Sequence, residues 1–146
     1  MNTLKLYLGT LRSENTKISY GHDIQAMLDF VGKTESDITL ADLLGWVNDM
    51  KERGNSTATI ARRIGSVKRY YEFLVEMEIL ENNPAKKLKA PKIVNKVEPT
   101  LTSDDIHAIL ASTNNARDKA IIATLASTGM RISELINIKM TDIEGD

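Results

Sequence analysis

The sequence predicts an all-helical protein, and three observations lead to that expectation. Apolar residues recur three and four positions apart in one segment after another, which is the period of a helix. Ser, Thr or Asn stands where these segments begin, and Gly or Asn stands where several of them end, as helix caps do. No segment shows the strict alternation of a half-buried strand, so helices are expected throughout.

The first two helices are expected within residues 1–31. The leucine spacing in residues 1–12 predicts a short helix with a leucine stripe on one side. This stripe is expected to pack either on its own domain or on a neighbouring protomer. Ser13 or Asn15 is a suitable N-cap for a second helix that runs to about Val31 and is closed by Gly32. Its apolar stripe consists of Tyr20, Ile24, Met27, Leu28 and Val31.

Two longer patterns follow. Thr39 and Asp42 have the spacing of a capping box and open a third helix, which Gly54 ends. A fourth helix is expected from Ser56 or Thr57 to about Met77. Its apolar face comprises Ile60, Ile64, Val67, Tyr71 and Leu74. Its opposite, exposed face is expected to carry Thr59, Arg62, Arg63, Ser66, Arg69 and Tyr70. Such a cationic and hydroxylic face suits phosphate contact, but a solvated face that lacks acids remains an alternative.

The remainder contains a linker and two shorter helices. Asn82-Asn83-Pro84 ends the fourth helical region, and residues 84–88 add a single turn. Residues 89–99 form an extended, lysine-rich segment with two prolines. Thr102 and Asp105 repeat the capping-box spacing, and a further helix runs over residues 116–127.

Composition narrows the class of protein. The chain has 146 residues, no Cys and a formal net charge of −1. Without Cys it has no disulfide or thiolate metal site, and the isolated His22 and His107 do not suggest a metal centre. No apolar run is long enough for a membrane span, so we expect a cytoplasmic protein without a membrane partner. Cations cluster in two acid-free stretches, residues 57–71 and 84–97, which suggests one basic working surface.

The most informative motif surrounds Arg131. Gly129 and Met130 interrupt an apolar helix, and a second helical run begins directly after the arginine. Backbone on both sides aims the Arg131 side chain, and free helix-terminal N–H groups favour an anion nearby. The pattern resembles the first-arginine motif of tyrosine recombinases, the phage-integrase and Xer-like family. The matching residues are Thr128, Gly129, Met130, Arg131, Ile132, Ser133, Glu134, Leu135 and Asp142.

The resemblance extends along most of the chain. The other matching motifs are Asn15, Thr16 and Tyr20; residues 54–74; Asn83-Pro84-Ala85; Leu101, Thr102 and Ile106; and Arg117-Asp118. Asp105 departs from the family pattern, which has Glu there. The resemblance implies a SAM-like core-binding domain of four or five helices over residues 1–88. A basic linker over 89–100 and a truncated helical start of a catalytic domain over 101–146 would follow.

The family's reaction implies a role for few of these residues. Its members break and rejoin DNA through a 3′-phosphotyrosyl intermediate, without metal or other cofactor, and full-length proteins act as a tetrameric synapse. Only the first catalytic arginine maps here, onto Arg131, with Glu134 as its support. The second arginine and the nucleophilic tyrosine have no match, so the chain alone is expected to be inactive. The tyrosines of the first 88 residues are not expected to replace the nucleophile.

The expected partners are double-stranded DNA and other recombinase protomers. The expected DNA contacts are Asn15, Thr16, Ser19, Thr57, Thr59, Arg62, Arg63, Ser66, Arg69, Tyr70, Lys87, Lys89 and Lys92. Two alternatives remain open. One is a non-catalytic DNA-binding regulator or decoy with the same fold, and the other is a helical protein-interaction module whose basic residues only confer solubility.

Overall fold

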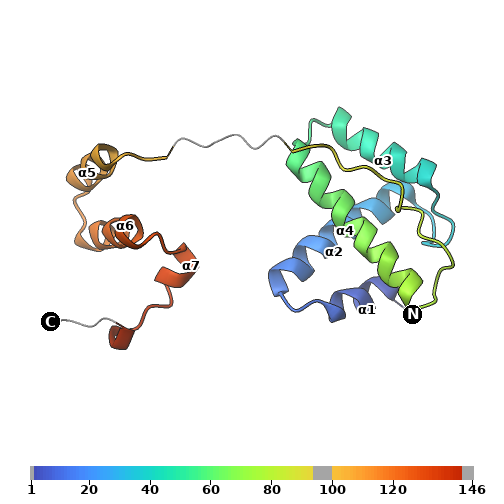
Figure 1. Cartoon of the computed structure of the whole chain (residues 1–146), viewed down its shortest axis with the longest axis horizontal. Helices are drawn as coiled ribbons and strands as arrows, with labels where there is room; N and C mark the ends of the chain where they lie inside the picture. The colour runs from blue at the N-terminus through green and yellow to red at the C-terminus, as the bar shows by residue number, and fades with distance from the viewer. Residues whose placement is uncertain (1, 94–99, 143–146) are drawn as a thin grey trace. The chain divides into compact units, whose positions relative to one another are not determined.

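Two compact units make up the chain, residues 1–95 and 96–146 (Figure 1). The computed structural model describes residues 2–93 and 100–142. The first unit contains α1 (Thr3–Thr10), α2 (Glu14–Val31), α3 (Leu40–Glu52) and α4 (Thr57–Glu76). The second contains α5 (Ser103–Ser112), α6 (Ala116–Thr128), α7 (Ile132–Leu135) and the 3₁₀ turn η1 (Met140–Asp142). Within the described ranges there is no strand, and the all-α prediction is confirmed.

Side-chain caps fix where the helices begin, as the sequence predicts. In the capping box of α3 the Asp42 backbone N–H donates to Thr39 Oγ1 at 3.3 Å, and the Thr39 N–H donates to Asp42 Oδ2 at 2.9 Å. Thr102 and Asp105 make the same pair of bonds before α5, at 3.2 and 2.8 Å. The hydrogen bond from Lys33 Nζ, followed by those from Thr39, lowers the pKa of Asp42 to about 2. Gly32 closes α2 with φ +65°, a conformation that favours glycine.

The core of the first unit is organised around α4. The predicted apolar face of α4 is fully or almost fully buried, and it meets Ile24 and Met27 of α2. Trp46 of α3 is buried in the same core. Tyr7 of α1 lies 5.5 Å from Tyr70 and 5.3 Å from Phe73 between ring centroids, a tilted aromatic arrangement.

A hydrogen-bonded group ties α1 and the loop before α3 to α4. Thr3 Oγ1 and Tyr70 Oη both donate to Glu35 Oε1, at 2.6 and 2.8 Å. Tyr71 Oη donates to the Glu35 carbonyl at 3.4 Å. Burial alone would raise the pKa of Glu35, but the hydrogen bonds from Thr3, the backbone and Tyr70 outweigh burial, so the pKa lies below its ordinary value.

The chain reverses direction after α4. Glu78 adopts a left-handed conformation with φ +56°, and the N–H groups of Ile79 and Leu80 both donate to the Leu74 carbonyl. The returning segment buries Ala85 and Leu88 in the core of the first unit. Lys68 Nζ then donates to the Leu88 carbonyl at 3.3 Å, which fixes the end of this segment beside α4.

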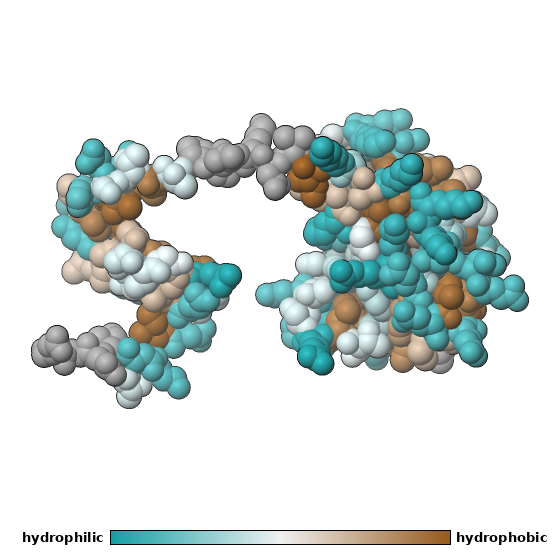
Figure 2. Space-filling model, viewed as in Figure 1, coloured by the Kyte–Doolittle hydropathy of each residue, from teal (hydrophilic) through white to brown (hydrophobic). Residues whose placement is uncertain are grey.

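The second unit has no such core. None of its side chains that the structure describes, within residues 100–142, is buried. Leu101, Ile132 and Ile136 are 65%, 60% and 75% exposed. Hydrophobic residues consequently reach the surface of this unit in several places (Figure 2). Helices held by so little apolar packing gain little stability from tertiary structure.

Hydrogen exchange is therefore expected to separate the two units. Amides of α5 and α6 should exchange far faster than those of α4, because local opening there exposes almost no additional apolar surface. Exchange measured by mass spectrometry on the intact chain tests this expectation. Equal protection in α4 and α6 would contradict it.

The Glu35 group predicts a pH dependence of folding. The pKa of Glu35 is lower in the folded chain, so its stabilising contribution is complete above the unfolded pKa of about 4.3 and is lost as the pH falls through the folded pKa. We expect Glu35→Gln to lower the free energy of unfolding at pH 7 and to differ less from wild type near pH 3. Urea unfolding across this range measures the difference. Glu52→Gln, at the exposed end of α3, is the control and should show no such trend.

Candidate nucleic-acid interface

The exposed face of α4 carries cations over its first four turns. Arg62 and Arg69 are exposed and lie seven positions apart, so they occupy the same side of the helix. Thr57 is exposed at its first turn, and Thr59 is half-buried. Glu72 and Glu76, also exposed, follow Arg69 towards the C-terminal end. The cationic surface is therefore confined to the N-terminal two thirds of α4.

Two residues expected on that face are buried, and this part of the prediction is wrong. Ser66 and Tyr70 have no exposed area. Tyr70 packs against Tyr7 of α1 and donates to Glu35, while Ser66 Oγ lies 3.1 Å from Asp23 Oδ2 of α2. Helices α1 and α2 cover this flank of α4, so its buried face is wider than a single apolar stripe. Neither side chain is available to a partner in this conformation.

The expected polar residues of α2 remain at the surface. Asn15 and Ser19 are exposed, and Thr16 is half-buried. Ser13, rather than Asn15, caps the helix, because Ser13 Oγ accepts from the Thr16 N–H at 3.4 Å. The Asn15 side chain is therefore not needed as the cap of α2.

The carboxylate of Asp23, which was not among the predicted site residues, lies between α2 and α4. Asp23 of α2 is only 3% exposed. It forms an ion pair and short hydrogen bond with Arg62 Nη1, and its Oδ1 lies 3.6 Å from Arg63 Nε. Ser19 precedes Asp23 by one turn, so Arg62 reaches the same side of α2 as the exposed Ser19. Asp23 directly precedes Ile24 of the predicted apolar stripe, and this position in the sequence could have indicated that its carboxylate is buried and paired.

The predicted linker lysines are exposed where the structure describes them. Lys87 belongs to the turn after Pro84, and Lys89 and Lys92 follow the buried Leu88. The second half of the predicted linker, residues 94–99, lies outside the described residues. Hydrophilic residues cover most of the face of the first unit that Figure 2 presents.

Arg131 stands at the predicted junction in the second unit. Gly129 ends α6 with φ +66°, and Arg131 directly precedes α7. The Arg131 side chain is 82% exposed. Its backbone N–H donates to Glu134 Oε2 at 2.7 Å, and its Nη1 donates to Glu134 Oε1 at 3.0 Å. The Glu134 carboxylate thus accepts from both the backbone N–H and the guanidinium group of Arg131. The backbone N–H that was expected to favour an external anion is therefore already bonded.

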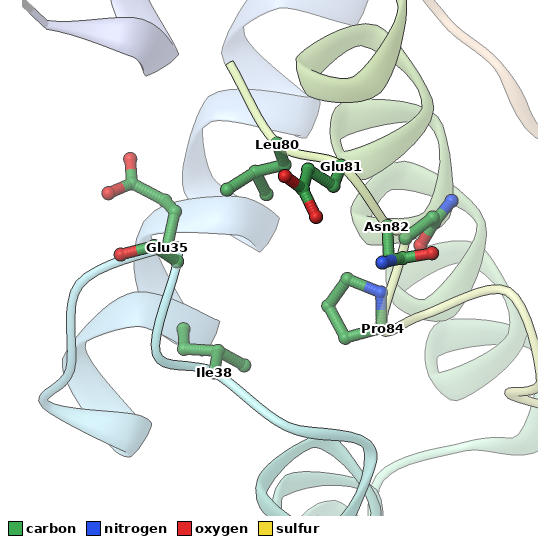
Figure 3. A pocket seen from close by; sticks show the side chains of 8 residues that line it. Glu35, Ile38, Leu80, Glu81, Asn82 and Pro84 are labelled. Atoms are coloured by element: carbon green, nitrogen blue, oxygen red, sulfur yellow. The ribbon is translucent and has the colours of Figure 1, made fainter. Parts of the chain in front are cut away.

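A separate hollow in the first unit does not suit a phosphate. It measures about 290 Å³ and lies between the loop before α3 and the segment after α4 (Figure 3). Ile38 and Leu80 line different sides of it, and its charged lining residues are Glu35 and Glu81. Carboxylates repel an anionic ligand.

Among the described residues, no group of three or more His, Cys, Asp or Glu side chains has an arrangement that could hold a metal ion. None of the helices in the described ranges combines the length and apolar character needed to cross a membrane.

Comparison with known proteins identifies the two parts of the chain. The family model for the phage integrase N-terminal SAM-like domain matches residues 4–78, and that for the phage integrase family matches residues 99–146. The curated tyrosine recombinase XerD of Oceanobacillus iheyensis is 32% identical over 140 residues, which cover 90% of this chain and 47% of that protein. The XerC of a Roseiflexus species is 30% identical, with 89% and 45% covered. The chain spans about half the length of these curated relatives.

Solved structures agree on the fold. The integrase of transposon Tn1549, determined in complex with a circular intermediate DNA, matches with a TM-score of 0.68 at 20% identity. The match covers 99% of this chain and 50% of the integrase chain in that structure. The integrase of mycobacterium phage Brujita matches with a TM-score of 0.55 at 22% identity, covering 94% and 47%.

The fold of residues 3–88, the Arg131 junction and the two family models lead to one assignment. The chain belongs to the phage integrase family of tyrosine recombinases.

Proposed function

We propose that this chain binds double-stranded DNA as the DNA-binding portion of a site-specific tyrosine recombinase. The observation that carries the proposal is the exposed pair Arg62 and Arg69 on α4, beside a surface of α2 that exposes Asn15 and Ser19. Guanidinium groups bind phosphate oxygens in a bidentate manner, and short polar side chains donate to the same oxygens.

The proposed division of labour follows the two matched segments. Residues 1–88 would form the core-binding domain, 89–100 the basic linker and 101–146 the start of the catalytic domain. The matches at 4–78 and 99–146 support this division, as do the two compact units of the structure. Lys87, Lys89 and Lys92 would add phosphate contacts outside α4. Other protomers on the same DNA are proposed as further partners.

Arg131 is the proposed catalytic contribution of the second unit. In the longer protein a tyrosine hydroxyl would attack the scissile phosphate, whose oxygens gain negative charge in the transition state. A guanidinium fixed nearby stabilises that charge. Glu134 supports the proposal because its two hydrogen bonds restrict Arg131 while most of the side chain stays exposed.

The proposed DNA contact on α4 can be tested by removing its two exposed charges. We expect Arg62→Gln with Arg69→Gln to weaken binding to a duplex at least about tenfold, because two charge-assisted bonds are lost. The slope of log affinity against log salt should fall by about 1.8, or about 0.9 for each phosphate contact. Fluorescence anisotropy at several salt concentrations measures both quantities.

Glutamine is chosen because it retains much of the side-chain stem and leaves a donor for Asp23. Lys5→Gln, an exposed cation on α1 outside the proposed interface, is the charge-matched control for a single loss. An unchanged salt slope in the double variant would remove α4 from the interface.

A second prediction concerns Arg131. We expect Arg131→Ala to leave the affinity of this chain for duplex DNA nearly unchanged, and to abolish strand cleavage when the segment is part of a protein with the remaining catalytic residues. A loss of roughly a hundredfold or more is typical for one oxyanion-stabilising group. Cleavage of a suicide substrate measures the effect, with Lys139→Gln as the exposed control. Retained cleavage would exclude Arg131 from the active site.

A further inference from the structure

The buried Asp23 is the group in this chain whose role the proposed DNA contacts leave unexplained. A carboxylate taken out of water is costly unless it is paired and hydrogen-bonded. Asp23 has three partners, all on α4: Arg62, Arg63 and Ser66. One negative charge thus faces two positive charges, and the group keeps a net charge of +1.

Each arginine contacts Asp23 through one nitrogen of its guanidinium group, and part of each side chain remains exposed. Arg62 uses Nη1 for Asp23, while 47% of its side chain remains exposed. A guanidinium has five N–H donors, so donors of Arg62 remain for an outside acceptor. Arg63 Nε is buried, has no hydrogen-bond partner among the described residues and lies 3.6 Å from Asp23 Oδ1, while 29% of its side chain is exposed. That distance permits ionic attraction but is too long for a hydrogen bond.

Ser66 completes the arrangement. Its hydroxyl lies 3.1 Å from Asp23 Oδ2 and 3.0 Å from the Arg63 carbonyl. A hydroxyl carries a single proton, so it can donate to only one of these oxygens at a time. Ser66 holds the Asp23 carboxylate against α4 only when its proton points to Oδ2, whereas the ion pair with Arg62 holds it in either geometry.

We propose that Asp23 is a positioning residue, which holds the guanidinium groups of Arg62 and Arg63 in place for phosphate contact. The proposal rests on the proposed DNA binding and deepens it. A free arginine side chain loses rotamer freedom when it binds, and a side chain already held in place loses less. Asp23 therefore increases DNA affinity although its own charge repels DNA.

The charge of Asp23 and its positioning of the arginines change DNA affinity in opposite directions. Asp23→Asn, which keeps the shape of the side chain and removes its charge, therefore tests the proposal. Bulk electrostatics predicts tighter DNA binding for the variant, because the chain becomes more positive by one charge. Positioning predicts binding about fivefold to tenfold weaker, the effect of releasing two arginine side chains. Asp49→Asn is the matched control. Asp49 of α3 also pairs with an arginine, the C-cap residue Arg53, at 2.9 Å, but this pair lies outside the proposed interface. The control variant should bind DNA at least as tightly as wild type.

A double-mutant cycle separates positioning from a general structural effect. In the Arg62→Gln/Arg63→Gln background, Asp23→Asn should no longer weaken binding, because the side chains it acts through are absent. An equal loss in that background would mean that Asp23 acts through the fold, and the proposal would be overturned. Equal or tighter binding by Asp23→Asn in the wild-type background would overturn it as well.

The wild-type chain gives a measurement that does not depend on any variant folding. NMR relaxation of the arginine Nε–Hε groups in the free chain should show Arg62 and Arg63 to be more restricted than Arg69, for which no ion pair is found among the described residues. Equal mobility of the three arginines would overturn the proposal even if Asp23→Asn failed to fold. Absence of DNA binding by wild type, in contrast, would overturn the proposed function itself, so the two failures are distinguishable.

Discussion

The packing of α4 against α1, α2 and α3 is the constraint on which the first unit depends. One side of α4 supplies the apolar residues that meet Ile24, Met27 and Trp46. The adjoining flank supplies the polar groups that meet Asp23 and Glu35. What remains exposed is a narrow strip, and the charges on that strip are therefore the ones left for a partner. The same helix both holds the unit together and presents its cationic surface.

The helices themselves could be predicted because their signals are local. Thr39 with Asp42 and Thr102 with Asp105 form capping boxes from residues three positions apart, and Gly32 and Gly129 end helices through their own backbone conformation. The Arg131 junction was predictable for the same reason. Each of these features is determined within one or two turns of chain.

The composition of the interface could be predicted only in part, because burial depends on distant residues. Ser66 and Tyr70 have the polar character of a surface, but α2 and the loop before α3 supply partners that lie far from them in sequence: Asp23 for Ser66 and Glu35 for Tyr70. The position of Asp23 beside the apolar stripe of α2 indicates that it is buried, but no periodicity in either helix identifies Arg62 as its partner. The helices α5 and α6 were also predicted, yet none of their side chains is buried, since a local pattern indicates that a helix forms and not what it packs against.

The reversal at Glu78 has a consequence for where the chain leaves the first unit. A helix that continued straight through residues 78–88 would carry Lys87 and Lys89 beyond the acidic end of α4, by about 1.5 Å per residue. Because the chain instead folds back, the Leu88 carbonyl lies beside Lys68 in α4, and Lys89 begins next to this cation rather than beyond the acidic end of the helix.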